Sequence, residues 1–138
     1  MDKKAGDLIA AYLDRAREKL KSARDLFAAQ DWGDCVSRAY YCAFHAAQAV
    51  LLSEGLSADT HQGILNLFGL YFVRNNKFDK RFAKMLHNLK DDRENGDYDL
   101  FSPIDEETAC QSLDGAEEFL KEAERYLSAA GLVSRSIS

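Results

Sequence analysis

Apolar residues recur at steps of three and four along most of this chain, and no alternating strand-like pattern stands out. This spacing predicts a first amphipathic helix over residues 7–29. Its apolar positions are Leu8, Tyr12, Ala16, Leu20, Ala23 and Phe27. Turn-prone residues at 30–34 interrupt the pattern, and a second helix is expected over 33–53. The wide apolar stripe of this second helix predicts a central position against several other helices.

Two shorter helical segments are expected after the second helix. Gly55 has the position of a glycine that ends a helix in the left-handed conformation, and Asp59 or Thr60 can cap the helix that follows. The residues at 75–76 interrupt the apolar spacing, which resumes over 78–89. The pattern therefore predicts two helices joined by a bend.

The last third of the chain contains a predicted loop and a predicted final helix. Arg93–Asp99 lacks apolar periodicity and contains Asn-Gly, which favours an exposed loop. Ser102–Asp105 supplies a capping hydroxyl, a proline suited to a first turn and an acid, so a helix is expected to start there. The apolar seam of this helix consists of Ala109, Leu113, Ala116, Leu120, Ala123 and Leu127.

Together these elements predict an all-α protein, an antiparallel up-and-down bundle of four to five helices. A chain of 138 residues suits one compact domain. We expect this domain to span residues 1–130, with a frayed tail at 131–138.

The composition bears on location and on metal binding. No apolar run reaches the ~20 residues needed to span a bilayer, and no signal-peptide pattern is present, so we expect a cytoplasmic protein. Cys35, Cys42 and Cys110 form no Cys-x-x-Cys pair and are interpreted as small core residues. The three histidines lack the spacing of metal ligands on one helix, so neither a metal site nor a cofactor is expected.

The formal net charge is −5 and is unevenly distributed. Residues 74–90 hold six basic residues and one acid, whereas residues 104–127 hold eight acids and two basic residues. The acidic balance disfavours indiscriminate nucleic-acid binding, which needs a concentrated basic surface. The uneven distribution can steer an anionic partner to one end of the molecule, or it can reflect two solvated helix faces.

The second predicted helix carries a polar stripe. On a 3.6-residue period, one face holds Arg38, Tyr41, His45 and Gln48. Arg38 and His45 lie roughly 10 Å apart along the axis and can address an anionic ligand or a partner subunit together. His45 can exchange a proton with a ribose hydroxyl or a leaving oxygen, Arg38 can hold a phosphate, and Tyr41 can position a nucleotide.

A structural role is the alternative interpretation of these residues. In that case His45 forms a hydrogen bond inside the bundle, and Arg38 pairs with Asp97 or Asp99. His61, which follows a capping threonine at a helix start, is expected to anchor its turn rather than to perform chemistry.

Several motifs, taken in order, resemble the HEPN domain family, and most closely its small stand-alone UPF0332-type proteins of bacteria and archaea. The matching segments are Arg38–Ala47, Gly55–Leu56, Thr60–Phe68, Arg93 and Asp97–Asp99. The resemblance covers roughly residues 7–127, which is nearly the whole chain.

This resemblance implies a helical bundle, usually a homodimer, that often pairs with a minimal nucleotidyltransferase in a toxin-antitoxin or related system. Many members are metal-independent ribonucleases whose signature is an Arg followed after four to six residues by a His. Arg93 matches that Arg by position, but Tyr98, Asp99 and Leu100 stand where the His is expected.

Two main functions therefore stay open, with a purely structural adaptor as a third. The first is a homodimeric binding module that holds a nucleotidyltransferase partner, a nucleotide or RNA without cleaving it. The second is a ribonuclease toxin with a displaced site. The candidate catalytic residues are Arg38, His45 and Arg93, and the candidate ligand-binding residues are Tyr41, Gln48 and Tyr98.

Overall fold

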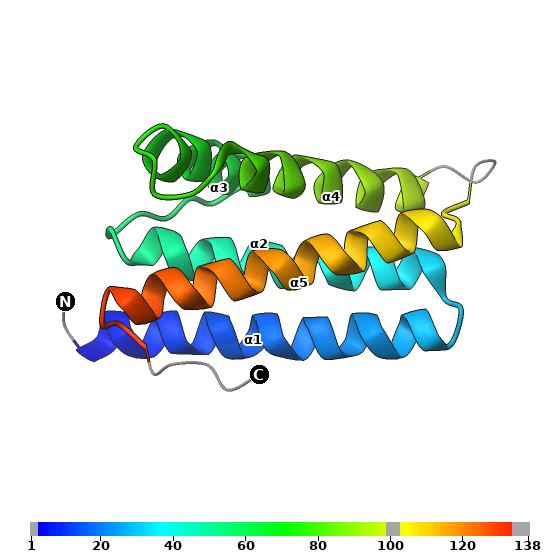
Figure 1. The fold of residues 1–138 in the computed structure, drawn as a ribbon, viewed down its shortest axis with the longest axis horizontal. Helices are drawn as coiled ribbons and strands as arrows, with labels where there is room; N and C mark the ends of the chain where they lie inside the picture. The colour runs from blue at the N-terminus through cyan, green and yellow to red at the C-terminus, as the bar shows by residue number, and fades with distance from the viewer. Residues whose placement is uncertain (1–2, 99–102, 134–138) are drawn as a thin grey trace.

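The computed structural model describes residues 3–98 and 103–133, and the regular structure within these ranges is helical (Figure 1). The elements are α1 (Lys3–Ala28), α2 (Trp32–Leu52), α3 (His61–Phe68), the π-helical turn η1 (Gly69–Val73), α4 (Lys80–Tyr98) and α5 (Glu106–Ala129). The four long helices alternate in direction along the chain, which confirms the predicted up-and-down bundle. Most of the predicted tail, residues 134–138, lies outside the described residues.

The helix α2 is the centre of the bundle, as its wide apolar stripe predicted. It packs against α1, α3, α4 and α5, and Figure 1 shows it behind α5, between α1 and α4. Its buried small residues are Ala39, Ala43, Ala46, Ala47 and Ala49. Because the spacing of packed helices depends on the side chains at their contact, these alanines allow several neighbours to approach α2 closely.

Both predicted signals between α2 and α3 are confirmed. Gly55 has a φ of +70°, and the backbone amide of Leu56 donates to the carbonyl of Leu51 at 3.0 Å. Thr60 caps α3, because its side-chain oxygen accepts a hydrogen bond from the amide of Gly63 at 2.9 Å.

The predicted bend at 75–76 is also confirmed. The helix α3 runs directly into η1, whose wider turns end at Val73. Asn76 then takes a φ of 59°, in the left-handed region that asparagine tolerates, and α4 begins at Lys80. The apolar spacing located the break but did not distinguish a π-helical turn from an α-helical one.

The predicted loop over Arg93–Asp99 is wrong, because α4 continues through Tyr98. Two ion pairs, each between residues one helical turn apart, stabilise this end of the helix. Lys90 pairs with Glu94 at 2.7 Å, and Arg93 pairs with Asp97 at 3.4 Å. These pairs offset part of the low helix propensity of the Asn-Gly sequence. Asp99 lies outside the described residues.

The final helix starts later than predicted. Asp105 is the N-cap, and its side chain accepts a hydrogen bond from the amide of Thr108 at 2.8 Å, so Pro103 precedes the helix instead of lying in its first turn. The sequence offers two possible N-caps, Ser102 and Asp105, and the carboxylate of Asp105 is the one that caps α5. The seam residues of α5 are buried, except Leu113, which is half-buried.

The cysteine prediction holds for two of the three residues. Cys35 and Cys42 are buried in α2. Cys110 is exposed on α5, one turn from Asp114, so its interpretation as a core residue is wrong. It follows the buried Ala109 by one position, and a rotation of about 100° per residue turns it away from the core.

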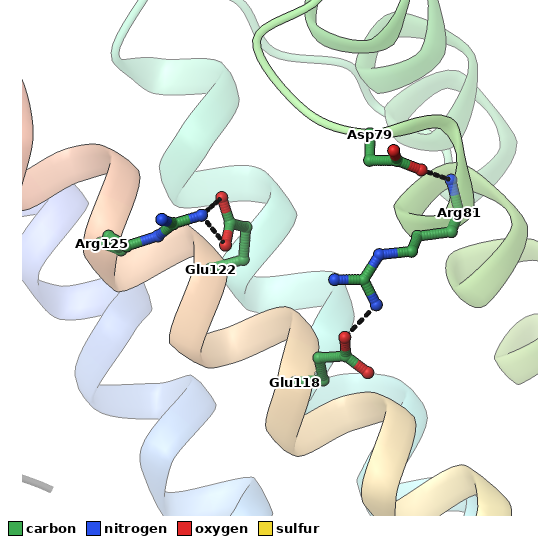
Figure 2. A network of polar contacts seen from close by, with 5 residues as sticks. All are labelled: Asp79, Arg81, Glu118, Glu122 and Arg125. Carbon is green, nitrogen blue, oxygen red and sulfur yellow. Dashed lines mark hydrogen bonds and ion pairs between the residues drawn. The ribbon is translucent and has the colours of Figure 1, made fainter.

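The basic and acidic segments of the chain pack against each other as α4 and α5. Figure 2 shows Arg81 of α4 reaching Glu118 of α5, with which it forms an ion pair, while Arg125 pairs with Glu122 within α5. The side chain of Asp79 accepts a hydrogen bond from the backbone amide of Arg81 at 2.9 Å. Part of the charge asymmetry in the sequence is therefore neutralised across a helix–helix contact.

Residues 3–98 and 103–133 show neither a membrane-spanning helix nor a metal-binding cluster. None of the helices there combines the length and the apolar character that a bilayer crossing requires. Within the same residues, no group of three or more His, Cys, Asp and Glu side chains is arranged to hold a metal ion.

Candidate functional site

One cluster of aromatic, histidine and arginine side chains forms where α2, α3 and α4 meet. We call it the Tyr41 cluster, and its members are Tyr40, Tyr41, Phe44, His45, His61 and Arg93. Tyr41 is at its centre, with its ring centroid 6.1 Å from that of His45 and 5.9 Å from that of His61. The guanidinium carbon of Arg93 lies 5.2 Å from the centroid of the Tyr41 ring. Two imidazoles and a guanidinium thus surround one half-buried phenol.

The helix α3 contributes His61 from its first position. The ring of His61 stacks on Phe44, with centroids 4.2 Å apart, and its Nδ1 lies 2.8 Å from the hydroxyl of Tyr40. These contacts hold the imidazole against α2, as expected for an anchoring residue. They also bring the imidazole next to Arg93. Burial lowers the pKa of His61, and the positive charge of Arg93 lowers it further.

The capping turn before α3 requires a glycine at its fourth position. A Cβ atom added to Gly63 would lie 2.9 Å from the Cβ of Ala58 and 2.9 Å from Oγ1 of Thr60. Real Cβ atoms essentially never approach neighbours this closely. The absence of a side chain at Gly63 therefore allows the turn that carries His61 to close.

His45 lies on the other side of Tyr41. Its Nδ1 is 2.9 Å from Oε1 of Gln48, one turn later, and its ring stacks on Tyr12 of α1. Burial lowers the pKa of His45; the hydrogen bond to Gln48 opposes this shift, and the charges of Arg15 and Lys19 add to it. The imidazole therefore stays neutral more readily than a solvated histidine.

The predicted polar stripe of α2 is accessible along its length. Arg38 is exposed, and Tyr41, His45 and Gln48 are half-buried. Among the described residues, Arg38 forms no hydrogen bond or ion pair with a member of the Tyr41 cluster. Tyr41 contacts both His45 and Arg93 and so links these two candidate residues without Arg38. The suggested pairing of Arg38 with Asp97 is not observed.

Arg93 is held over two tyrosine rings near the end of α4. Its guanidinium carbon lies 5.6 Å from the ring of Tyr40 as well as 5.2 Å from that of Tyr41. The buried Nε atom lies 3.4 Å from a carboxylate oxygen of Asp97 and makes no hydrogen bond within the described part of the chain. Asp97 therefore compensates the charge of Arg93 without satisfying its donor. Tyr98 is the last residue of α4, and its side chain lies outside the described residues.

The electrostatics of the cluster favour neutral imidazole and neutral phenol. Burial lowers the pKa of His61, and the charges of Arg93 and Lys90 lower it further, while Glu94 opposes them. Burial raises the pKa of the Tyr40 phenol well above its usual range, more than Arg93 lowers it. Near neutral pH the guanidinium of Arg93, which is paired with Asp97, thus lies beside uncharged hydrogen-bonding groups.

These shifts predict that the protein loses stability as the pH falls from about 7.5 to 5. In the unfolded chain His45 and His61 titrate near their ordinary pKa of about 6.5. In the folded protein the pKa values of both residues are lower. The unfolded state then binds more protons in this window, so acid favours unfolding. Urea unfolding at several pH values measures the effect. The slope should flatten in a His45→Gln, His61→Gln double variant and persist when the exposed His87 is changed to Gln; an equal slope in all three proteins would contradict the assignment.

No pattern in the sequence connects His61 with Arg93. Their positions are 32 apart in the chain, and no helical period links residues of different helices. The family signature directs attention to positions just after Arg93, whereas the histidine that the fold supplies comes from the start of α3. Two neighbouring tyrosines, Tyr40 and Tyr41, are the feature of the sequence that could have pointed to this site. The side chains of His61 and Arg93 approach these rings from different helices.

The fold and the Tyr41 cluster define a small helical-bundle protein in which an arginine and two histidines surround an accessible tyrosine. A family model described as "HEPN domain" matches residues 9–128. The chain therefore belongs to the HEPN domain family, as its motifs indicated, and the UPF0332 resemblance is confirmed by the relatives below.

Two relatives and one solved structure show what this chain is similar to. "Putative toxin MJ0605" of Methanocaldococcus jannaschii is 32% identical over 127 residues, covering 92% of this chain and 89% of that protein. A "UPF0332 protein" of Thermotoga maritima is 32% identical over 120 residues, covering 87% of this chain and 91% of that protein. The crystal structure of TT1696 from Thermus thermophilus superposes with a TM-score of 0.73 at 21% identity, over 86% of this chain and 98% of that one. The last similarity supports the fold alone.

Proposed function

We propose that this protein is a HEPN-type binding module that holds a nucleotide or RNA at the Tyr41 cluster. The observation that carries the proposal is the position of Arg93, whose guanidinium lies over Tyr41 while His45 and His61 flank the same ring. A guanidinium binds phosphate oxygens strongly, and aromatic rings are surfaces on which bases stack. The cluster therefore combines a phosphate-binding group with base-stacking groups.

The module is proposed to act as a homodimer and as the partner of a minimal nucleotidyltransferase in a toxin-antitoxin-like pair. The toxin name of the Methanocaldococcus jannaschii relative and membership of the HEPN family support this proposal. Light scattering counts the copies in solution, and co-purification with a nucleotidyltransferase encoded beside this protein tests the pairing. A monomer, or a partner that elutes separately, would contradict the corresponding part.

A metal-independent ribonuclease is the second candidate function. The observation that favours it is the presence of two imidazoles with lowered pKa values beside one arginine, since a neutral imidazole can accept a proton and an arginine can stabilise a developing phosphate charge. The histidine of the family signature is still missing, because Tyr98 and the two residues after it occupy the positions where it is expected. Incubation of the protein with RNA separates the two functions: intact RNA supports binding alone, and cleavage that is lost in His45→Ala or His61→Ala supports the ribonuclease.

We expect Arg93→Gln to weaken the binding of a short single-stranded RNA roughly tenfold or more, since a charge-assisted hydrogen bond to phosphate is worth about 1.5–3 kcal/mol. Fluorescence anisotropy of a labelled oligonucleotide measures the affinity. Arg74→Gln is the matched control, because it removes the same charge from an exposed position outside the cluster.

The two variants together decide whether the cluster is the binding site. A general charge effect would lower the affinity equally in both variants, with a shallower salt dependence in each. Equal affinities for the wild type and Arg93→Gln would exclude the Tyr41 cluster as the site.

A further inference from the structure

The hydroxyl of Tyr40 lies within hydrogen-bond distance of one ring nitrogen of His61. Tyr40 is fully buried at the contact between α2 and α3. A buried hydroxyl must donate its hydrogen to an acceptor, because an unpaired buried donor is costly. Among the described residues, the acceptor within hydrogen-bond distance of this hydroxyl is Nδ1 of His61, at 2.8 Å.

The opposite arrangement leaves a polar atom unsatisfied. If Nδ1 of His61 carried the hydrogen, Tyr40 would accept, and its own hydrogen would have no partner in the described part of the chain. The raised pKa of the phenol keeps that hydrogen in place at neutral pH. The hydroxyl therefore donates, and the neutral imidazole carries its single hydrogen on Nε2.

The Nε2 atom of His61 is the ring nitrogen that the bond to Tyr40 leaves available. No hydrogen bond joins it to another of the described residues, and His61 is half-buried rather than sealed in the core. Stacking on Phe44 fixes the plane of the ring, and the bond to Tyr40 fixes its rotation. The donor at Nε2 thus has a set direction before any ligand binds.

We propose that Tyr40 holds His61 as the Nε2-protonated tautomer, so that the neutral imidazole donates a hydrogen bond, beside Arg93, to a phosphodiester oxygen of the bound ligand. This inference rests on the proposed function and assigns the ligand chemistry of the same cluster. His61 and Arg93 approach the tyrosine pair of α2 from two different helices, with ring centroids of His61 and Tyr40 5.7 Å apart and the Arg93 guanidinium carbon 5.6 Å from the Tyr40 ring. A neutral imidazole donor adds a hydrogen bond to a phosphodiester oxygen without adding charge, next to the guanidinium that binds the same group. Tyr40 acts as a positioning residue, and His61 touches the ligand.

Nitrogen NMR of the histidine-labelled wild-type protein tests the tautomer directly. At a pH where His61 is neutral, we expect its Nε2 to carry the proton and its Nδ1 to show the shift of a hydrogen-bond acceptor; the signals are assigned by their loss in His61→Gln. In Tyr40→Phe, the Nδ1 signal should move to the position of an unbonded acceptor. Protonation of His61 at Nδ1 in the wild type would overturn the inference, and this measurement needs no variant to fold other than the one used for assignment.

Binding of a labelled single-stranded RNA supplies the second readout. Tyr40→Phe should weaken binding roughly two- to tenfold, the range for loss of a neutral hydrogen-bond arrangement, whereas Tyr71→Phe should bind like the wild type because Tyr71 is exposed on η1. His61→Gln places an amide donor near the position of Nε2 and should bind more tightly than His61→Asn, whose amide lies near Nδ1. The reverse order of the two His61 variants would contradict the donor role.

The combined results separate this inference from the proposed function. If Arg93→Gln weakens binding while the tautomer and the affinity are insensitive to Tyr40→Phe, the inference fails and the proposed function stands. If Arg93→Gln has no effect on binding, the proposed function fails, and the NMR result alone then decides the tautomer assigned to His61.

Discussion

Replacing Phe119 with alanine is expected to lower the free energy of unfolding by about 3–5 kcal/mol. Phe119 is fully buried on α5, and its ring contacts three other phenylalanines, with centroid distances of 5.3 Å to Phe68, 6.3 Å to Phe78 and 6.0 Å to Phe82. These partners come from α3, from the segment before α4 and from α4. Removing the ring leaves a cavity that several helices line, and packed helices collapse into such a space only in part.

Urea denaturation followed by circular dichroism measures this loss. The control is Leu70→Ala, which truncates a large apolar side chain that is 45% exposed and should cost far less. A loss below about 1 kcal/mol for Phe119→Ala would mean that the aromatic core rearranges around the gap.

Arg17→Met is expected to lower the free energy of unfolding by about 2–3 kcal/mol, because it leaves a buried carboxylate without its partner. Glu124 on α5 has a side-chain exposure of only 5%, and one of its oxygens accepts hydrogen bonds from Nε and a terminal nitrogen of Arg17 on α1, at 2.9 and 2.7 Å. Arg17 itself is 36% exposed, so water can reach the vacated space and reduces the loss below that of a fully buried pair.

A double variant isolates the cause of this effect. Replacing both Arg17 and Glu124 with methionine removes the stranded charge and should recover most of the lost stability, since apolar pairs often replace buried ion pairs without cost. If the double variant is less stable than Arg17→Met, the pair contributes more than the charge balance explains. Thermal or urea unfolding of the three proteins at pH 7 provides the comparison.

The sequence predicted the bundle because apolar periodicity is a local property that tertiary packing reinforces. The stripe of α2 and the seam of α5 correspond to buried faces of the structure. The errors fall where local signals compete. At Arg93–Tyr98, an Asn-Gly pair suggested a loop, whereas ion pairs one turn apart and packing maintain the helix. At the start of α5, two possible caps lie close together, and Asp105 is the one used.

The candidate site was predictable only along one helix. Periodicity showed that Tyr41, His45 and Gln48 share a face of α2, and these three side chains are accessible in the structure. It gave no information on which residues of α3 and α4 lie opposite that face. The approach of His61 and Arg93 depends on the capping turn before α3 and on the length of α4, and the latter was underestimated.

The Tyr41 cluster takes its side chains from three helices, so it exists only while these helices are packed together. The unfolded chain keeps every one of these groups and loses the arrangement. A ligand that binds the assembled cluster therefore stabilises the native state by mass action. At concentrations well above the dissociation constant, this stabilisation grows with the logarithm of the ratio of ligand concentration to dissociation constant. For the ligand proposed above, the free energy of unfolding should therefore rise with its concentration, because the unfolded chain has no assembled cluster to bind it.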